Sequence, residues 1–397
     1  MSTSDRFFVI ADEPLRTMDD EQELLASLGR ITKFSPPVHT CSTGWSFQGF
    51  YSGPTSVAYL FFRLSHMFPD LEFKQQSLFE WAEAYLALGA RRSMAAPDPA
   101  HCGIASEPLA HLALAAVMQR DASLVRRLCA LEPALNAPDP AGSNEWLYGR
   151  AGFLYFLRMC RAFFTHEESP SSLDIDLTHL DGLVVATLEK TVTRVLASPQ
   201  PWTWHGKPYL GAAHGALGIL TQAVLSQPAH APSLQRLLRD LLRTQRASGN
   251  FPSSATSGAA DRLVQFCHGA PGFAVSLAAV APRFPALRAE IDDALRSARA
   301  HVAARGLLTK TPCLCHGIAG NALALVEYED EGAFRRFLAC MGSEELRRRG
   351  WLEEGRGGED VGLFTGEAGR AWVWGLALAL KGEGGGGVGR CIGYNDV

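Results

Sequence analysis

The 397-residue sequence lacks an excess of charge of either sign. Lys and Arg number 37, Asp and Glu number 41, and the formal net charge is -4. Binding to nucleic acids depends on cationic side chains that neutralise phosphates, and the positive runs here are short, such as residues 347–349. We expect that run to lie on a solvated helix face. The composition therefore argues against nucleic acid as a partner.

Long apolar runs and an export signal are also missing. The opening stretch MSTSDRFFVIADEP has neither the basic segment nor the apolar core of a secretory signal. The longest charge-free apolar stretch, residues 210–225, is too short to span a bilayer. We expect a cytoplasmic protein without a membrane span, and peripheral association with a membrane stays open. In a reducing compartment, its nine cysteines favour metal ligands or catalytic thiols over disulfides.

A third absence is the sustained alternation of apolar and polar residues that marks β-strands. Helical periodicity is present instead, as in PSLQRLLRDLLRTQ (residues 232–245), where Leu recurs at three- and four-residue spacing between charged residues. Other segments, such as AGNALALVEY (residues 319–328), are almost uncharged and are typical of helices buried on all sides. The pattern predicts an all-α protein in which amphipathic helices surround apolar ones.

A Gly-x-x-Gly step precedes or opens the apolar segments and recurs along the chain. Its seven copies, with Ser at the second position in the first two, begin at Gly53, Gly103, Gly149, Gly215, Gly269, Gly317 and Gly366. They are 46 to 66 residues apart, which leaves room for two helices in each unit. Glycines at such a step permit positive φ and close approach of helices. The sequence thus predicts a repeat of seven helix pairs that closes into a ring.

Residues just before these glycines are the candidates for chemistry, because equivalent positions in a closed ring converge on one cavity. They include His214, the pair Cys267 and His268, and the pair Cys315 and His316. Thiolate and imidazole are preferred zinc ligands, and a catalytic zinc has three protein ligands and one open position. Two Cys-His pairs in the same repeat register therefore predict a zinc site.

The residues alone leave two points open. They do not decide which histidine completes the ligand set, and Cys313 could in principle chelate together with Cys315. A sugar-cleaving ring of helices would instead need paired carboxylates in the cavity. Because the candidate cavity positions carry Cys and His, we disfavour that class of enzyme.

The motifs LYGRAGFLYFL, YLGAAHGALGI, GNFPSS, FCHGAPG, LCHGIAGNA and LFTGEAGRAWV, in this order, resemble those of the eukaryotic lanthionine synthetase C-like proteins, relatives of the bacterial lanthionine cyclases. The resemblance covers residues 49–380. It implies a double α/α barrel, or toroid, of seven inner and seven outer helices, in agreement with the repeat count. We accordingly expect an N-terminal extension packing on the barrel (1–40), the barrel itself (41–381) and a Gly-rich C-terminal tail (382–397).

The resemblance also implies roles for individual residues. By motif position, one zinc ion would be held by Cys267, Cys315 and His316, the catalytic residues would be His214 and Glu145, and glutathione would contact Lys310 and Arg356. Roles for Arg262, His268 and Cys313 stay unassigned.

The function that this resemblance implies is a zinc-dependent addition of the glutathione thiol to dehydroalanine or dehydrobutyrine residues in proteins, which forms a thioether. Glutathione and proteins or peptides with such residues would then be the partners. The alternative is a non-catalytic zinc- and glutathione-binding protein that acts in signalling or as an adaptor.

Overall fold

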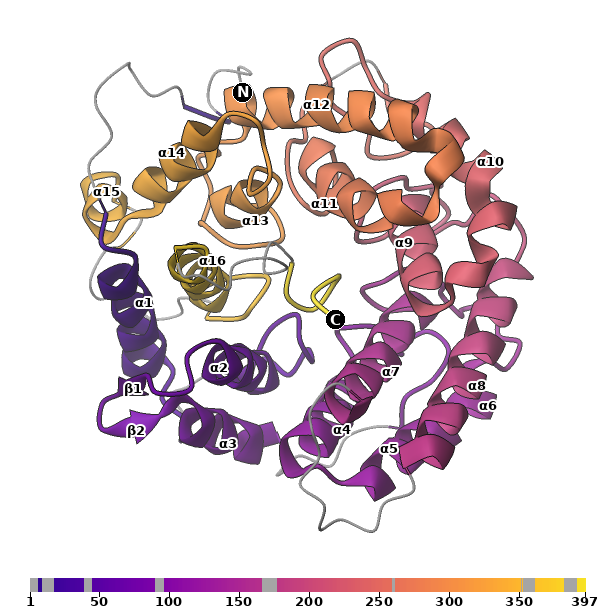
Figure 1. Cartoon of the computed structure of the whole chain (residues 1–397), viewed down its shortest axis with the longest axis horizontal. Coiled ribbons are helices and arrows are strands. Elements are labelled where there is room, and N and C mark those ends of the chain that lie inside the picture. The colour runs from indigo at the N-terminus through magenta and orange to yellow at the C-terminus, as the bar shows by residue number, and fades with distance from the viewer. Residues whose placement is uncertain are drawn as a thin grey trace.

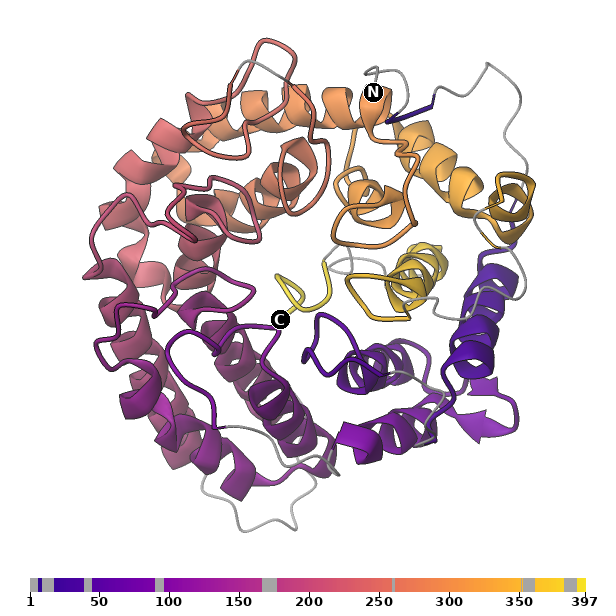
Figure 2. The ribbon, with the colours of Figure 1, turned by 180° about the vertical axis from the view of Figure 1, so that it is seen from behind.

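The structure, a computed structural model, describes residues 6–8, 18–38, 45–89, 96–165, 177–258, 261–350, 352, 361–381 and 391–397. Within these residues the chain forms two concentric rings of helices (Figures 1 and 2). The inner ring consists of α2 (Pro54–Met67), α4 (Glu107–Gln119), α7 (Arg150–Thr165), α9 (Ala216–Ser226), α11 (Ala270–Val280), α13 (Ile318–Leu323) and α16 (Glu367–Ala379).

Each inner helix packs against one outer helix. In the order of the inner helices above, the outer partners are α3 (Leu78–Gly89), α5 (Ala122–Ala130), α8 (Leu177–Leu196), α10 (Ala231–Leu242), α12 (Arg288–Arg305), α14 (Glu331–Met341) and α1 (Asp20–Phe34). The first outer helix of the chain thus pairs with the last inner helix and closes the ring. The predicted all-α toroid of seven inner and seven outer helices is confirmed.

The remaining described elements are short. They are α6 (Glu132–Leu135), α15 (Ser343–Arg348), three single turns of 3-10 helix (Pro228–His230, Ala281–Arg283 and Pro285–Leu287) and a hairpin of β1 (Glu72–Phe73) and β2 (Gln76–Ser77). None of the described helices has the length and apolarity needed to cross a membrane.

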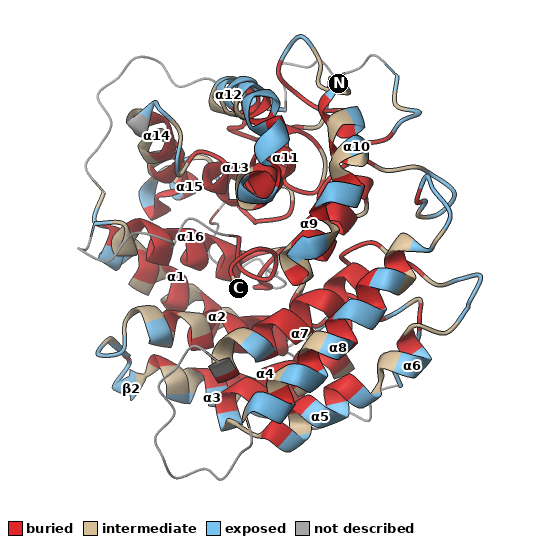
Figure 3. Cartoon of the chain, turned by 45° about the vertical axis from the view of Figure 1, so that its right-hand side comes forward, coloured by how far each residue is buried: buried red, intermediate tan, exposed pale blue. Residues whose placement is uncertain are grey.

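Burial follows the apolar pattern of each ring. Along α16, residues 367–377 are all buried, including the indoles of Trp372 and Trp374. The outer helix α10 instead buries Leu234 and Leu238 and exposes Arg236, and Figure 3 shows the same two-faced burial along α8 and α12. Apolar surface on the inner helices is therefore covered from both sides, which is the main source of stability in such a core.

The glycine steps are explained mainly by close approach of backbone. The loop before each inner helix folds back over its first turn, so a Cβ added at Gly320 would lie 1.8 Å from the carbonyl oxygen of Leu314. At Gly218 the corresponding distance, to the oxygen of Ala212, is 2.0 Å. Positive φ adds a second requirement at Gly269, where φ is +111°.

The second unit departs from the register expected from its glycine. Helix α4 begins at Glu107, with Ser106 as its N-cap and a proline in its first turn. Gly103 therefore precedes the helix by four residues, whereas the first glycine of the other units comes directly before it. The residue equivalent to the first glycine is Ser106, and matching the Gly-x-x-Ser letters had placed the unit three residues too early.

Backbone hydrogen bonds connect the loops before successive inner helices around the ring. The N–H of Cys267 donates to the carbonyl of Cys315 (3.1 Å), that of Cys315 to Phe364 (2.9 Å), and that of Phe364 to Tyr51 (3.0 Å). The series continues from Phe50 to Ile104, from Ile104 to Trp146 and from Trp146 to Ala213. Residues at equivalent positions of different units thus lie beside one another at one end of the ring.

The last residues of the sequence lie inside the ring. Residues 391–396 are buried, and Figure 1 shows this segment near its centre. The sequence predicts a Gly-rich tail over 382–397, and nothing in the composition indicates that its final part is buried. Of that assignment, residues 382–390 fall outside the described residues.

Candidate functional site

The reactive side chains stand at two consecutive positions before the inner helices. Two residues before the N-cap stand Cys267 and Cys315, and one residue before it stand His214, His268 and His316. Each cysteine N–H is fixed to the next unit by the backbone bonds described above. The repeat therefore places thiols and imidazoles together at one end of the ring.

The two thiols contact each other and one imidazole. Cys315 lies close enough to Cys267 and to His316 for each of them to shift the pKa of its thiol, and both cysteines are buried. The interaction with Cys315 lowers the pKa of Cys267, whereas the interaction with Cys267, together with burial, raises the pKa of Cys315. Cys267 is thus the first of the pair to ionise.

Each sulfur also accepts a hydrogen bond from a neutral side chain. The amide nitrogen of Gln265 lies 3.1 Å from the sulfur of Cys267, and the Tyr51 hydroxyl lies 3.5 Å from that of Cys315. The amide oxygen of Gln265 in turn accepts from the ammonium group of Lys310 at 3.1 Å. A positive charge is therefore coupled through one amide to the first cysteine, which favours its thiolate form.

A second pair, His214 and Glu145, is held by an extensive set of hydrogen bonds. Nδ1 of His214 lies 2.9 Å from the carboxylate of Glu145, which is 2% exposed. The carboxylate also accepts from the backbone N–H groups of Leu147 (2.8 Å) and Tyr148 (2.5 Å). A carboxylate so fixed keeps the proton of neutral His214 on Nδ1, and Nε2 remains for proton exchange.

Aromatic rings cover the imidazole of His214. The indole of Trp204 is parallel to it, with ring centroids 3.8 Å apart and an interplanar angle of 4°. Tyr148 is also nearly parallel to His214, at 6.3 Å. The ring centroid of His268 lies 6.0 Å from that of His214, and burial, together with the nearby His214 imidazole, lowers the pKa of His268 to about 4. His268 is therefore neutral at pH 7 and is a poor proton donor there.

A cavity of about 310 Å³ adjoins the His214–Glu145 pair. Its lining also includes Asn144, Arg194 and Thr203. The pair therefore has open space beside it in which a reacting group can be placed.

The other candidates named from the sequence are Cys313, Arg262 and Arg356, together with the zinc ligand set as a whole. Cys313 is buried, which raises the pKa of its thiol to about 12, and the carbonyl of exposed Arg262 accepts a hydrogen bond from Arg6. Arg356 lies outside the described residues, so its assignment to glutathione stays a prediction. In the described part of the chain, no group of three or more His, Cys, Asp or Glu side chains has the arrangement of a metal site. The zinc ligand set stays a prediction as well.

Sequence reasoning missed Tyr51, Gln265 and Trp204. Tyr51 stands two residues before Gly53, the same register as Cys267 and Cys315, so the repeat itself carried the signal. Trp204 reaches His214 from an irregular loop closed by a bridge to Lys207, and no periodic pattern marks it.

A double ring of helices with thiols and imidazoles gathered at one end is a helical toroid with a candidate thiol-based site. The family model described as "Lanthionine synthetase C-like protein" matches residues 45–377. The chain belongs to this family.

Individual relatives agree with this assignment. The chain is 30% identical over 311 residues to "Glutathione S-transferase LANCL1" from Danio rerio, which covers 73% of this chain and 72% of that protein. It is 31% identical over 250 residues to "LanC-like protein GCL1" from Arabidopsis thaliana (58% and 54%). The solved structure of "Nisin cyclase" has the same fold, with a TM-score of 0.52 at 14% identity over 90% of this chain and 93% of that one.

Proposed function

We propose that this protein adds the thiol of glutathione to dehydroalanine and dehydrobutyrine residues of proteins, with one zinc ion held by Cys267, Cys315 and His316. The observation that carries the proposal is the proximity of two thiols and an imidazole at the end of the ring that also holds a second histidine, His214, bound to a buried carboxylate. The name of the Danio rerio relative supports glutathione as the thiol substrate.

The chemical types of the three donors suit zinc. Cysteine sulfur and histidine nitrogen are its preferred ligands, and three of them leave the open position of a catalytic site. Gln265 and Tyr51 already donate to the two sulfurs, and outer donors of this kind stabilise ligand thiolates. Zinc bound there would supply a positive charge that lowers the pKa of an incoming thiol.

The side chains account for the proton balance of the addition. The glutathione thiol loses its proton to solvent, its sulfur bonds to the β-carbon of the alkene, and the π electrons of the double bond move to the α-carbon. That carbon then takes a proton, which we assign to Nε2 of His214. Glu145 holds the ring in place through Nδ1 and compensates the positive charge of protonated His214.

The reaction can be tested directly on the purified protein. Incubation with glutathione and a dehydroalanine peptide is expected to give a peptide whose mass rises by one glutathione, at a rate well above that without protein. Loss of this rate on treatment with a zinc chelator, and its return with added zinc, supports the metal. Calorimetric binding of glutathione without any thioether product would instead favour the signalling or adaptor function. Because the substrate is a reduced thiol, we propose that the protein acts in the cytoplasm.

Lys310 offers a test of the glutathione contact. Its exposed side chain is a fixed positive charge near Cys267, suited to a carboxylate of glutathione. A Lys310→Met variant is expected to raise KM for glutathione about 10-fold, the effect of losing one charge-assisted hydrogen bond, while kcat changes little. Steady-state kinetics of Lys310→Met would check this, with Lys190→Met, a change at an exposed lysine on α8, as the control. A fall in kcat at unchanged KM would contradict the contact and assign Lys310 to the support of Gln265.

A further inference from the structure

The segment of residues 391–397 occupies the bore of the inner ring and carries polar side chains into it. Its sequence is CIGYNDV, and Asn395 and Asp396 are 7% and 9% exposed. Polar groups are buried at a cost unless they are hydrogen-bonded. The partners of this segment therefore decide whether its burial is specific.

Asp396 is bound by two inner helices. Its carboxylate accepts from the hydroxyl of Tyr59 on α2 (2.9 Å) and from that of Tyr155 on α7 (2.8 Å), and it forms an ion pair with Arg63 of α2. The N–H of Gly393 also donates to it at 2.9 Å. The carboxylate is thus almost fully satisfied by groups that surround it.

Tyr394 is bound by two further inner helices. Its hydroxyl is 2.7 Å from that of Ser276 on α11, and its carbonyl accepts from Gln222 on α9 (2.9 Å) and from Arg158 on α7 (3.0 Å). Arg158 donates to the carbonyl of Val397 as well. Four inner helices, distant in sequence, therefore supply side chains to a seven-residue segment.

The segment also forms the floor beneath the candidate functional site. The indole N–H of Trp146 donates to the carbonyl of Gly393 at 3.1 Å. The ring of Tyr394 packs edge-on against Trp146 and Phe266, with centroids 5.4 and 5.2 Å away. Trp146 follows Glu145 and Phe266 precedes Cys267 in the sequence.

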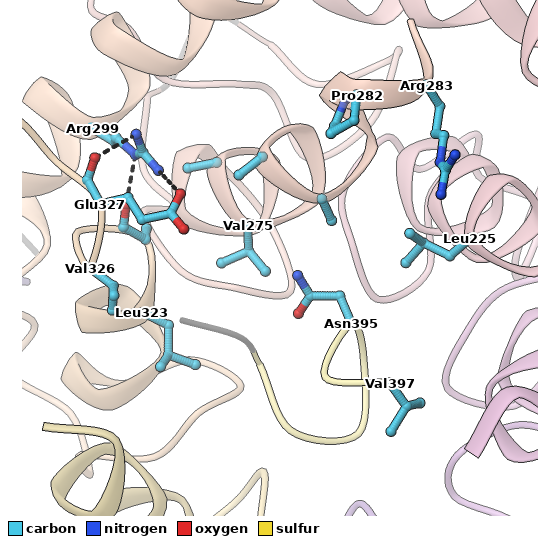
Figure 4. A pocket seen from close by; sticks show the side chains of 14 residues that line it. Leu225, Val275, Pro282, Arg283, Arg299, Leu323, Val326, Glu327, Asn395 and Val397 are labelled. Atoms are coloured by element: carbon cyan, nitrogen blue, oxygen red, sulfur yellow. Dashed lines mark hydrogen bonds and ion pairs between the residues drawn. The ribbon is translucent and has the colours of Figure 1, made fainter. Parts of the chain in front are cut away.

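On the opposite side, the segment borders a cavity of about 310 Å³ (Figure 4). Asn395 and Val397 line it together with Leu225 and Leu323, which lie at the C-terminal ends of α9 and α13. This cavity is at the other end of the inner helices from the cysteines and histidines. The segment therefore separates the candidate site from a pocket on the far side of the ring.

We propose that the bore is a peptide-binding site, that its ligand is the segment 391–397 of the same chain, and that recognition rests on the Tyr-Asn-Asp sequence. The contacts are those of a bound peptide: an ion pair, side-chain hydrogen bonds to its backbone and an aromatic anchor. Without it, the charges of Arg63 and Arg158 would lie in the bore without compensation, which is strongly unfavourable. Nine residues, six of them glycine, connect the segment to Lys381 after α16. The same peptide chemistry could also come from a second copy of the chain.

Substitution in the full chain tests the recognition of Asp396. Asp396→Asn removes the charge that faces Arg63 and is expected to lower Tm by about 5 °C, the effect of breaking a buried ion pair in a chain of this size. Asp292→Asn, which removes an exposed carboxylate paired with Arg288 on α12, is the matched control and is expected to leave Tm within about 1 °C. Equal Tm values for the two variants would overturn the proposal.

Supplying the segment as a separate molecule tests whether it is a ligand. A chain that ends at Arg390 is expected to bind one molecule of the synthetic heptapeptide CIGYNDV per chain. Its Tm is then expected to rise to that of the full chain. The peptide with Asn in place of Asp396 is expected to bind at least about 10-fold more weakly. If the shortened chain is insoluble, it is refolded with each peptide, and recovery with the native sequence alone supports the proposal. No binding, equal binding of both peptides or no recovery would overturn it.

Size-exclusion chromatography of the full chain separates the two sources of the peptide. A monomer agrees with occupation by the chain's own segment, whereas a dimer that is lost on removal of 391–397 would overturn that assignment. All these readouts measure stability, binding or size, so they stand or fall independently of catalytic activity.

Discussion

A Cys315→Ala variant is expected to lose its zinc and its activity together. Of the three proposed ligands, Cys315 is the one that contacts both of the others, Cys267 and His316. Its removal leaves two ligands, fewer than any zinc site of the structural or catalytic kind. We expect zinc to fall from about one per chain to below detection by metal analysis. The rate of glutathione addition is expected to fall more than about 100-fold, which exceeds the effect of losing a residue that only hydrogen-bonds to a metal ligand.

Cys340→Ala provides the matched control, because Cys340 is another buried free thiol but lies on the outer helix α14. It loses a similar volume and is expected to keep both zinc and turnover. Because a bound ion stabilises only the folded state, added zinc should raise Tm of the parent protein and of Cys340→Ala but not of Cys315→Ala. Folded parent protein without zinc, or a Cys315→Ala variant that retains it, would contradict the proposed ligand set.

The parts of this site that could be predicted are those fixed by the repeat. A ring of close-packed helix pairs brings equivalent positions together, so the register of Cys267, Cys315 and His316 in the sequence was enough to predict their proximity. The roles of these residues came from the resemblance and stay predictions. Tyr51 occupies the same register and was overlooked because a tyrosine before a glycine suggests no chemistry by itself.

The parts that could not be predicted depend on contacts outside the repeat. Trp204 reaches His214 from a loop whose path is set by tertiary packing. Gln265 is recognised only from its hydrogen bonds to the sulfur of Cys267 and the ammonium group of Lys310. In the second unit the letters of the motif were misleading, whereas local rules were sufficient: Ser at the N-cap and Pro in the first turn mark the true start of α4 at Glu107.

The buried segment 391–397 illustrates a third limit. A glycine-rich stretch followed by seven residues with no helical or strand period is typical of a tail. Its burial is instead set by complementary groups such as Tyr59, Arg63 and Arg158, which are placed on separate helices far away in the sequence. Charged side chains within apolar helices, such as Arg63 and Arg158, were the available signal that the bore holds a polar partner.

A His214→Asn variant is expected to lose turnover while it keeps its metal. The proposed reaction needs a proton at the α-carbon, and asparagine can preserve the hydrogen bond to Glu145 but cannot exchange a proton. We expect kcat for glutathione addition to fall by about 100- to 10,000-fold, the range for loss of a general acid, with zinc content and Tm close to those of the parent. His214 is not a proposed metal ligand, so a loss of kcat with zinc retained would distinguish its role from that of Cys315.

The chain supplies a matched control for this substitution in His230, whose Nε2 lies 3.0 Å from a carboxylate oxygen of Glu189 at the outer surface of the ring. His230→Asn breaks a histidine–carboxylate contact of similar length in a position remote from the cysteines, and it is expected to leave kcat unchanged. Undiminished turnover in His214→Asn would remove this histidine from the mechanism. Loss of zinc in the same variant would instead show that His214 supports the metal, because a pure proton donor has no influence on metal content.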